Sequence, residues 1–168
     1  MPTMMVSRIS GYDNNHCVQM PVIQNDPTSH VEYRSEGAYH IRSKNQPHVY
    51  WFLPDSTKST TQSMKRIFLD TRKATKFKMI RDNTSPSAPT ADRRVLERRD
   101  LVHVVALSPS GNISVGLSNT SVVTTDAHHR FSFGSFYNGD FGVNWGAKEI
   151  GPYIIYGVEY AGEEWELV

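Results

Sequence analysis

The sequence has one cysteine and no long apolar run. Cys17 alone cannot form a disulfide within the chain, so we expect a protein that works in a reducing compartment or does not need oxidation. No segment comes near the roughly 20 apolar residues that a bilayer-spanning helix requires. Residues 1–10 contain one arginine and no sustained apolar stretch, and we therefore expect that the protein is not secreted through a signal peptide.

Motifs of known catalytic chemistry are missing as well. No Gly-x-Ser-x-Gly elbow frames a serine, so the sequence does not indicate a hydrolase of that kind. No glycine-rich loop is followed by Lys-Ser or Lys-Thr, which a phosphate-binding loop requires. We therefore expect a protein that is not an enzyme and that uses no cofactor.

What the sequence does have is charge sorted by position. Residues 58–99 hold twelve of the eighteen Lys and Arg against four acidic residues, which gives this basic block a net charge of +8. Residues 101–168 carry a net charge of −5. A basic block of this kind attracts polyanions such as nucleic acid. A chain with oppositely charged halves can also pair with a copy of itself.

Short strand-like segments bounded by turn residues dominate the pattern. The run 48–53 is strongly apolar and lies between Pro47 and Pro54, which predicts a buried central strand with Trp51 in the core. About ten such segments at short spacing favour a mainly β fold, an antiparallel β-sandwich or jelly roll with one short helix. We expect a single β-rich domain over residues 1–168.

The basic block itself fits two local structures. Over residues 64–80 the apolar positions match either a helical stripe or two strands. We favour strands at 66–70 and 76–81, which would place Lys76 and Lys78 on one face. Seven residues of the block are the expected polyanion-binding set. They are Lys65, Arg66, Arg72, Lys73, Lys76, Lys78 and Arg81. Because no aromatic-rich RNA-binding signature appears, we expect contact with the backbone of nucleic acid or another polyanion, not with bases.

Two further local patterns predict specific elements. The sequence Thr90-Ala91-Asp92 is typical of a helix N-terminus and predicts the short helix over 91–99. The sequence Asn138-Gly139-Asp140 lies between apolar segments 129–137 and 141–145, which predicts a β-hairpin.

Two alternative functions stay open at this point. Aromatic residues that escape the core would suit a carbohydrate-binding β-sandwich, although strand alternation turns most of them inward. Asp126 and His128 share a strand face, as a metal-dependent enzyme could require, with a third ligand still to be found. The competing interpretation of this second pattern is an ordinary polar strand end.

Part of the basic block resembles viral proteins. Residues 67–72 and 77–84 look like the paired strands of small-virus jelly-roll coat proteins, in which an Asp-x-Arg end precedes a strand of the form Phe-x-hydrophobic-hydrophobic-Arg-Asp. The resemblance implies a virion coat or matrix protein, located in the virion or in the cytoplasm or nucleus of a host cell. Such coats usually begin with an Arg-rich arm, whereas residues 1–11 contain only Arg8. The nucleic-acid contact would then have moved to residues 58–99.

A loop tetrapeptide points to the same class of protein. It consists of Pro86, Ser87, Ala88 and Pro89. It is similar to the Pro-Ser/Thr-Ala-Pro motif with which enveloped-virus matrix and Gag-type proteins recruit host budding machinery. The resemblance implies a host adaptor as a partner, and the competing interpretation is a plain linker.

The acidic C-terminal end is the expected self-association surface. Its residues are Glu163, Glu164, Trp165 and Glu166. A charged rim around an aromatic centre is typical of a subunit contact, and the basic block of a neighbouring copy would be its complement. The alternative is pairing within one chain, with no assembly.

Overall fold

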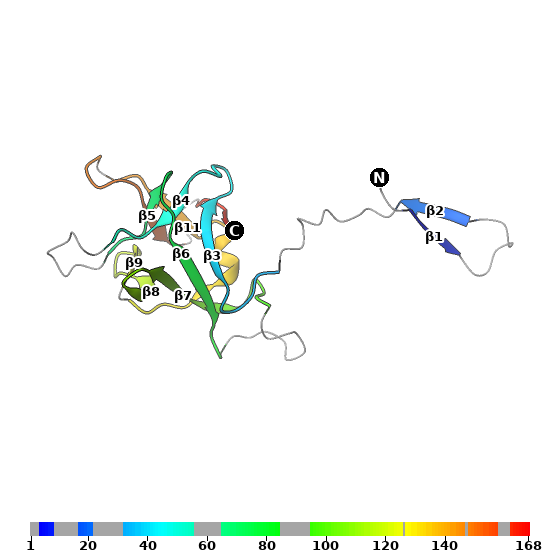
Figure 1. Cartoon of the computed structure of the whole chain (residues 1–168), viewed down its shortest axis with the longest axis horizontal. Coiled ribbons are helices and arrows are strands. Elements are labelled where there is room, and N and C mark those ends of the chain that lie inside the picture. The colour runs from blue at the N-terminus through cyan, green and yellow to red at the C-terminus, as the bar shows by residue number, and fades with distance from the viewer. Residues whose placement is uncertain are drawn as a thin grey trace. The chain divides into compact units, whose positions relative to one another are not determined.

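The chain folds as two compact units, Met1–Glu32 and Tyr33–Val168, where the sequence predicted one domain over 1–168. The computed structural model describes β1 (Met4–Arg8), β2 (Cys17–Pro21) and residues 32–55, 65–84, 95–125, 127–146, 148–157 and 162–168. In the first unit, β1 and β2 pair in an antiparallel sheet of their own (Figure 1). The second unit contains the sites that the sequence predicts.

The second unit is built from one antiparallel sheet of eleven strands. The strands are β3 (Ala38–Ser43), β4 (Tyr50–Phe52), β5 (Phe68–Asp70), β6 (Lys76–Arg81), β7 (Leu101–Ser108), β8 (Gly111–Leu117), β9 (Val123–Thr125), β10 (Phe131–Ser132), β11 (Phe141–Asn144), β12 (Tyr153–Tyr156) and β13 (Trp165–Leu167). Their order is β11-β12-β5-β4-β3-β6-β7-β8-β9, with β10 beside β7 and β13 beside β3. The sheet therefore connects strands that are far apart in the sequence.

The sheet curls until β9, at one end of it, reaches the segment before β5. The backbone N–H of Ile67 donates to the carbonyl oxygen of Val123 at 3.0 Å, and the N–H of Thr125 donates to the carbonyl oxygen of Lys65 at 2.8 Å. These bonds join β9 to the segment that leads into β5. The protein is thus mainly β, with a strongly curled antiparallel sheet of the sandwich or jelly-roll type, which confirms the predicted fold class.

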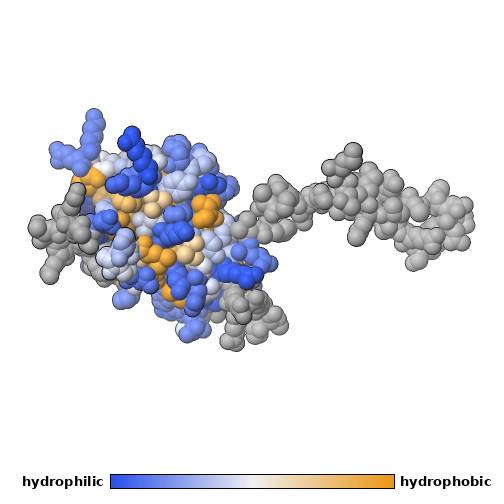
Figure 2. Space-filling model, viewed as in Figure 1, coloured by the Kyte–Doolittle hydropathy of each residue, from blue (hydrophilic) through white to orange (hydrophobic). Residues whose placement is uncertain are grey.

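The core lies inside this curled sheet. Trp51 on β4 is only 1% exposed, and its ring lies 5.9 Å from Phe77, 5.1 Å from Phe141 and 5.5 Å from Trp165, measured between ring centroids. The predicted central strand within 48–53 is therefore confirmed, with Trp51 in the core. On the face that Figure 2 shows, hydrophobic residues form small patches among hydrophilic ones, as expected when most apolar side chains lie inside.

The helix predicted over 91–99 is wrong in the part that the structure describes. Residues 95–100 form an isolated β-bridge and a turn. The N–H of Leu96 donates to the carbonyl oxygen of Tyr33 at 2.7 Å, and the Leu96 side chain is buried. Pairing with a distant segment satisfies the backbone that a helix would have satisfied locally. Residues 91–94 lie outside the described residues.

The hairpin predicted between 129–137 and 141–145 is also wrong. β10 pairs with β7 and β11 pairs with β12, and the short 3₁₀ helix η3 (Phe133–Phe136) lies between them. The helix places both Phe133 and Phe136 in the core, which a strand could not do at this odd spacing. Gly139, at φ +84°, serves the chain reversal after the helix.

Candidate nucleic-acid interface

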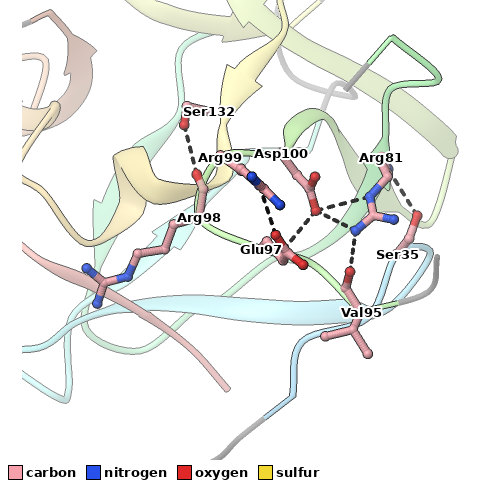
Figure 3. A network of polar contacts seen from close by, with 8 residues as sticks. All are labelled: Ser35, Arg81, Val95, Glu97, Arg98, Arg99, Asp100 and Ser132. Carbon is pink, nitrogen blue, oxygen red and sulfur yellow. Dashed lines mark hydrogen bonds and ion pairs between the residues drawn. The ribbon is translucent and has the colours of Figure 1, made fainter. Parts of the chain in front are cut away.

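The structure places Arg81, one of the seven expected polyanion-binding residues, inside the protein. Its Nε donates to Oδ2 of Asp100 at 3.0 Å, and its Nη2 contacts both this carboxylate and the carbonyl oxygen of Val95 (Figure 3). Asp100 is 0% exposed, and it also accepts a hydrogen bond from the N–H of Glu97 at 2.8 Å. Arg81 therefore holds β6 against the start of β7, and its assignment to a polyanion surface is corrected.

Lys78 is also engaged, although more weakly. It lies on the outer face of β6, with its Nζ 3.7 Å from Oε2 of Glu36. Glu36 is mostly exposed, so this ion pair is solvated and its net stabilisation is small. Lys78 is thus a partly neutralised charge rather than a free one.

Of the other five basic residues, four flank β5 along the chain, and the fifth, Lys76, is the first residue of β6. No ion pair between described residues involves any of them, and we call them the β5 cations. They are Lys65, Arg66, Arg72, Lys73 and Lys76. The nearest carboxylate along the chain, Asp70, accepts hydrogen bonds from the backbone N–H groups of Arg72 and Lys73 at 2.7 and 2.9 Å. Asp70 thereby shapes the turn after β5 without forming an ion pair with either side chain.

Three aromatic side chains form a row across the outer face of β4, β5 and β12. Phe52 pairs with Phe68, and Phe68 pairs with Tyr153. Residues directly opposite one another on neighbouring strands project from the same face of a sheet. All three are half-buried, and among the described residues they are not part of the set that packs against the core. We call Phe52, Phe68 and Tyr153 the aromatic row.

A cation lies over each end of the aromatic row. The guanidinium carbon of Arg66 is 4.5 Å from the ring centroid of Tyr153. The Nζ of Lys73 is 5.5 Å from the ring centroid of Phe52. A cation–π contact holds a charge in place without neutralising it. Arg66, Lys73 and the aromatic row thus form a positively charged aromatic surface. We call this surface, together with the other three β5 cations, the β5 face.

An open hollow of about 470 Å³ lies near the end of β5. Arg72, His48 and Asp70 contribute to its lining together with Trp145. Trp145 is 64% exposed, the most exposed of the large apolar side chains that the structure describes. An exposed tryptophan beside polar groups is the feature that the carbohydrate-binding alternative requires.

The expected self-association surface is built differently from the prediction. Trp165 is 0% exposed, and its indole Nε1 donates to the carbonyl oxygen of Phe141 at 3.1 Å. Its ring is therefore part of the core and does not form the apolar centre of a subunit contact, which corrects that assignment. Glu163 accepts a hydrogen bond from the hydroxyl of Ser43 at 3.0 Å.

The other two acidic residues pair within the chain. Glu166 accepts a hydrogen bond from Nε of Arg42 at 2.8 Å, and Glu164 accepts one from Nζ of Lys44. The hydrogen bond from Lys44 lowers the pKa of the Glu164 carboxyl. The intramolecular alternative is therefore favoured for this end of the chain, although its partner is β3 and not the basic block.

In the histidine-rich region, the structure shows a carboxylate that is hydrogen-bonded to Thr84 and His103. Oδ2 of Asp82 lies 2.8 Å from Nε2 of His103. Hydrogen bonds from the hydroxyl and the N–H of Thr84 lower the pKa of Asp82 to about 2, with smaller contributions from His103 and Arg130. His128 is exposed. The described residues contain no group of three or more His, Cys, Asp or Glu able to hold a metal ion.

Two predicted features lie outside the described residues. One is Asp126, the other expected metal ligand. The second is the tetrapeptide Pro86, Ser87, Ala88 and Pro89, so its role in recruiting a host adaptor stays a prediction.

The sequence did not lead us to predict the aromatic row. Strand alternation within Tyr50-Trp51-Phe52 places Trp51 on one face and its two neighbours on the other, so a buried Trp51 implies outward-facing neighbours. The sequence therefore did indicate that Phe52 faces outward. What the sequence could not supply is the identity of the strands beside β4, because Phe68 and Tyr153 come from distant parts of the chain.

The comparisons with known proteins do not assign the chain to a family. The chain matches no protein-family model, and no curated protein matches it. Within the described ranges, the structure contains no helix with the length and apolar character needed to cross a bilayer. Function therefore has to be inferred from the geometry of the β5 face.

Proposed function

We propose that the protein is a non-enzymatic, self-assembling structural protein of the virion coat or matrix type, and that it contacts nucleic acid through the β5 face. The observation that carries this proposal is the set of β5 cations, five basic residues that flank β5 or begin β6 and that form no ion pair with a described carboxylate. Cations on one surface repel one another, and a polyanion relieves that repulsion.

The affinity would come mainly from phosphates. Each phosphate that a Lys or Arg neutralises releases condensed counterions, which gives binding that does not depend on sequence and weakens as salt rises. A curled antiparallel β sheet of the sandwich or jelly-roll type supports the coat-protein part of the proposal, since this architecture is common in viral capsids. The location in a virion or in the cytoplasm or nucleus of a host cell belongs to the same proposal.

The experiment is to measure the size of the purified, nucleic-acid-free protein by light scattering, with and without single-stranded RNA. We expect large assemblies that form only when RNA is present. A matched variant in which all five β5 cations are replaced by glutamine should stay small under the same conditions. A wild-type protein that remains monomeric at high concentration with RNA present would contradict the proposal.

A second candidate function rests on Trp145. Its exposed indole, beside the hollow that Asp70 and His48 help to line, is suited to stacking on a sugar ring. This candidate predicts a monomer that binds neutral oligosaccharides and loses that binding on Trp145→Ala. The same substitution should leave RNA binding by the β5 cations unchanged if the first candidate is right.

A further inference from the structure

We propose that the β5 face binds single-stranded nucleic acid, with bases stacked on Phe52, Phe68 and Tyr153 and phosphates on the β5 cations. This inference rests on the proposed function and specifies its ligand. It also reverses the expectation that contact is made with the backbone alone.

The first reason is the position of the aromatic row. Phe52, Phe68 and Tyr153 occupy adjacent strands in direct register, and neighbouring strands are separated by about 4.8 Å. The row therefore extends over roughly 10 Å, which gives room for two or three bases, as on other sheet surfaces that stack RNA on aromatic side chains. The exposed parts of these half-buried rings would be removed from water when a base stacks on them, which favours binding.

The second reason is the charge at both ends of the row. Arg66 lies over Tyr153 and Lys73 lies over Phe52. A nucleic-acid strand that crosses the row would therefore meet a cation at each end of it. Both side chains are long and have several rotatable bonds, so when a base takes the ring face the cation can move to the adjoining phosphate. A combination of stacking platforms and a cationic path is what single-strand binding surfaces share.

The surroundings set the direction of the strand. Beside the row on the same outer face, Tyr50 on β4 lies opposite Asp70 on β5. On the other side of Tyr50 lies Arg42 on β3, whose charge is neutralised by Glu166. The carboxylate of Asp70 disfavours phosphates on that side. The nucleic acid should therefore run across the strands, along the row from Lys73 to Arg66, rather than along β4.

Single strands are favoured over duplexes for a steric reason. In a duplex the bases are stacked on one another and present only their edges, so the rings of the aromatic row would have no base faces to contact. Only the phosphate contacts would remain. The β5 cations alone would bind a duplex, heparin and a single strand according to charge, whereas the complete face discriminates among them.

The test uses the full chain and three labelled probes: an oligo(dT) single strand, a DNA duplex of the same length, and heparin, which is a polyanion without bases. We expect the single strand to bind more tightly than the duplex. The variants Phe52→Leu, Phe68→Leu and Tyr153→Leu keep an apolar side chain but lose the ring. Each should weaken single-strand binding by roughly 5- to 150-fold and leave heparin binding unchanged.

Two controls guard against misfolding. Tyr50→Leu removes an outward aromatic ring from β4 that lies outside the row, and it should leave single-strand affinity unchanged. Tyr153→Phe keeps the ring and should retain full binding. A single strand that contains 2-aminopurine gives a reading without any substitution, because stacking on the row should quench its fluorescence.

The contradicting outcomes separate the two proposals. Equal affinity for all three probes, or ring variants that bind the single strand as the wild type does, would overturn base stacking and leave the polyanion function standing. Displacement of the single strand by a neutral oligosaccharide would assign the row to sugars and overturn the inference. Failure to bind any of the three probes would overturn the proposed function together with this inference.

Discussion

The guanidinium of Arg81 lies against the carboxylate of Asp100, a side chain with no exposure to solvent. In the sequence, Arg81 is one of many basic residues in the block, and nothing local marks it as different. In the fold it neutralises a buried charge, fixes the segment 95–100 through Val95, and is itself only 13% exposed. The basic block therefore contains two kinds of cation, one that holds the fold together and one that faces outward.

The ion pair between Arg81 and Asp100 gives the first prediction. Arg81→Ala should lower the free energy of unfolding by about 3–5 kcal/mol, because it removes the guanidinium that lies against the buried Asp100 carboxylate. The measurement is urea denaturation. Lys78→Ala, which removes the exposed pair with Glu36, is the matched control and should cost about 1 kcal/mol or less. Equal effects of the two substitutions would show that the Arg81 pair is solvated.

The second prediction concerns Trp51. Trp51→Ala should cost about 3–5 kcal/mol of unfolding free energy, since it removes a buried ring and leaves a cavity among Phe77, Phe141 and Trp165. Trp145→Ala, at an exposed tryptophan, should change stability by about 0.5 kcal/mol or less. A similar cost at both positions would place Trp51 outside the core.

The third prediction is that folding stability depends on pH through the titration of His129. Its ring packs 4.7 Å from Phe131 and 5.8 Å from Tyr156, and burial, with a smaller effect from Arg130, lowers its pKa. The unfolded chain therefore binds a proton at a higher pH than the folded protein does, so stability should fall as the pH drops below about 6.5 and level off below the folded pKa.

The measurement is the urea midpoint at several pH values between about 7 and 5. His129→Gln should flatten this part of the curve. His128→Gln, at the exposed neighbouring histidine, should leave the curve as it is in the wild type. A stability that rises as the pH falls through this range would contradict the role of His129.

The fourth prediction concerns the acidic end of the chain. A double-mutant cycle on Arg42 and Glu166 should give a coupling energy of about 0.2–1 kcal/mol, as expected for an ion pair that solvent still reaches. Exchanging the two charges, with Arg42→Glu and Glu166→Lys together, should recover most of the stability that either substitution loses alone. Loss of assembly by the single variants, with no loss of stability, would instead favour a contact between copies.

Much of the strand pattern was predictable from the sequence because alternation is a local signal. In β6, the sequence Lys-Phe-Lys-Met predicts two buried apolar positions, and Phe77 and Met79 are fully buried. The predicted strands at 66–70 and 76–81 are confirmed as β5 and β6, which resolves the ambiguity between helix and strands over 64–80.

The errors arose where distant partners override local signals. The N-terminal helix signal near residue 91 could not show that Leu96 pairs with Tyr33. The turn signal at 138–140 was real, but it ends a 3₁₀ helix whose two phenylalanines fill the core. Likewise, the sequence shows that Glu166 is charged, but it could not show that its partner is Arg42, because the two residues are 124 positions apart.

The candidate site was predictable in charge but not in shape. Four of the seven expected cations flank β5 because they are close to it in the sequence, and Lys76 begins β6. The aromatic row could not be assembled from the sequence, because it needs the order β4-β5-β12. Local pattern therefore located the charge, and sheet topology placed the rings beside it.

The central claim is that the β5 cations bind nucleic-acid phosphates, and the salt dependence of single-strand binding tests it most directly. The slope of log K against log salt should be about −0.7 for each phosphate neutralised, so replacing all five β5 cations with glutamine should flatten the slope by up to about 3.5. Lys44→Gln, at an exposed lysine paired with Glu164, is the control and should leave the slope unchanged. A wild-type affinity that is the same at low and high salt, or a slope that the five substitutions do not alter, would contradict the claim.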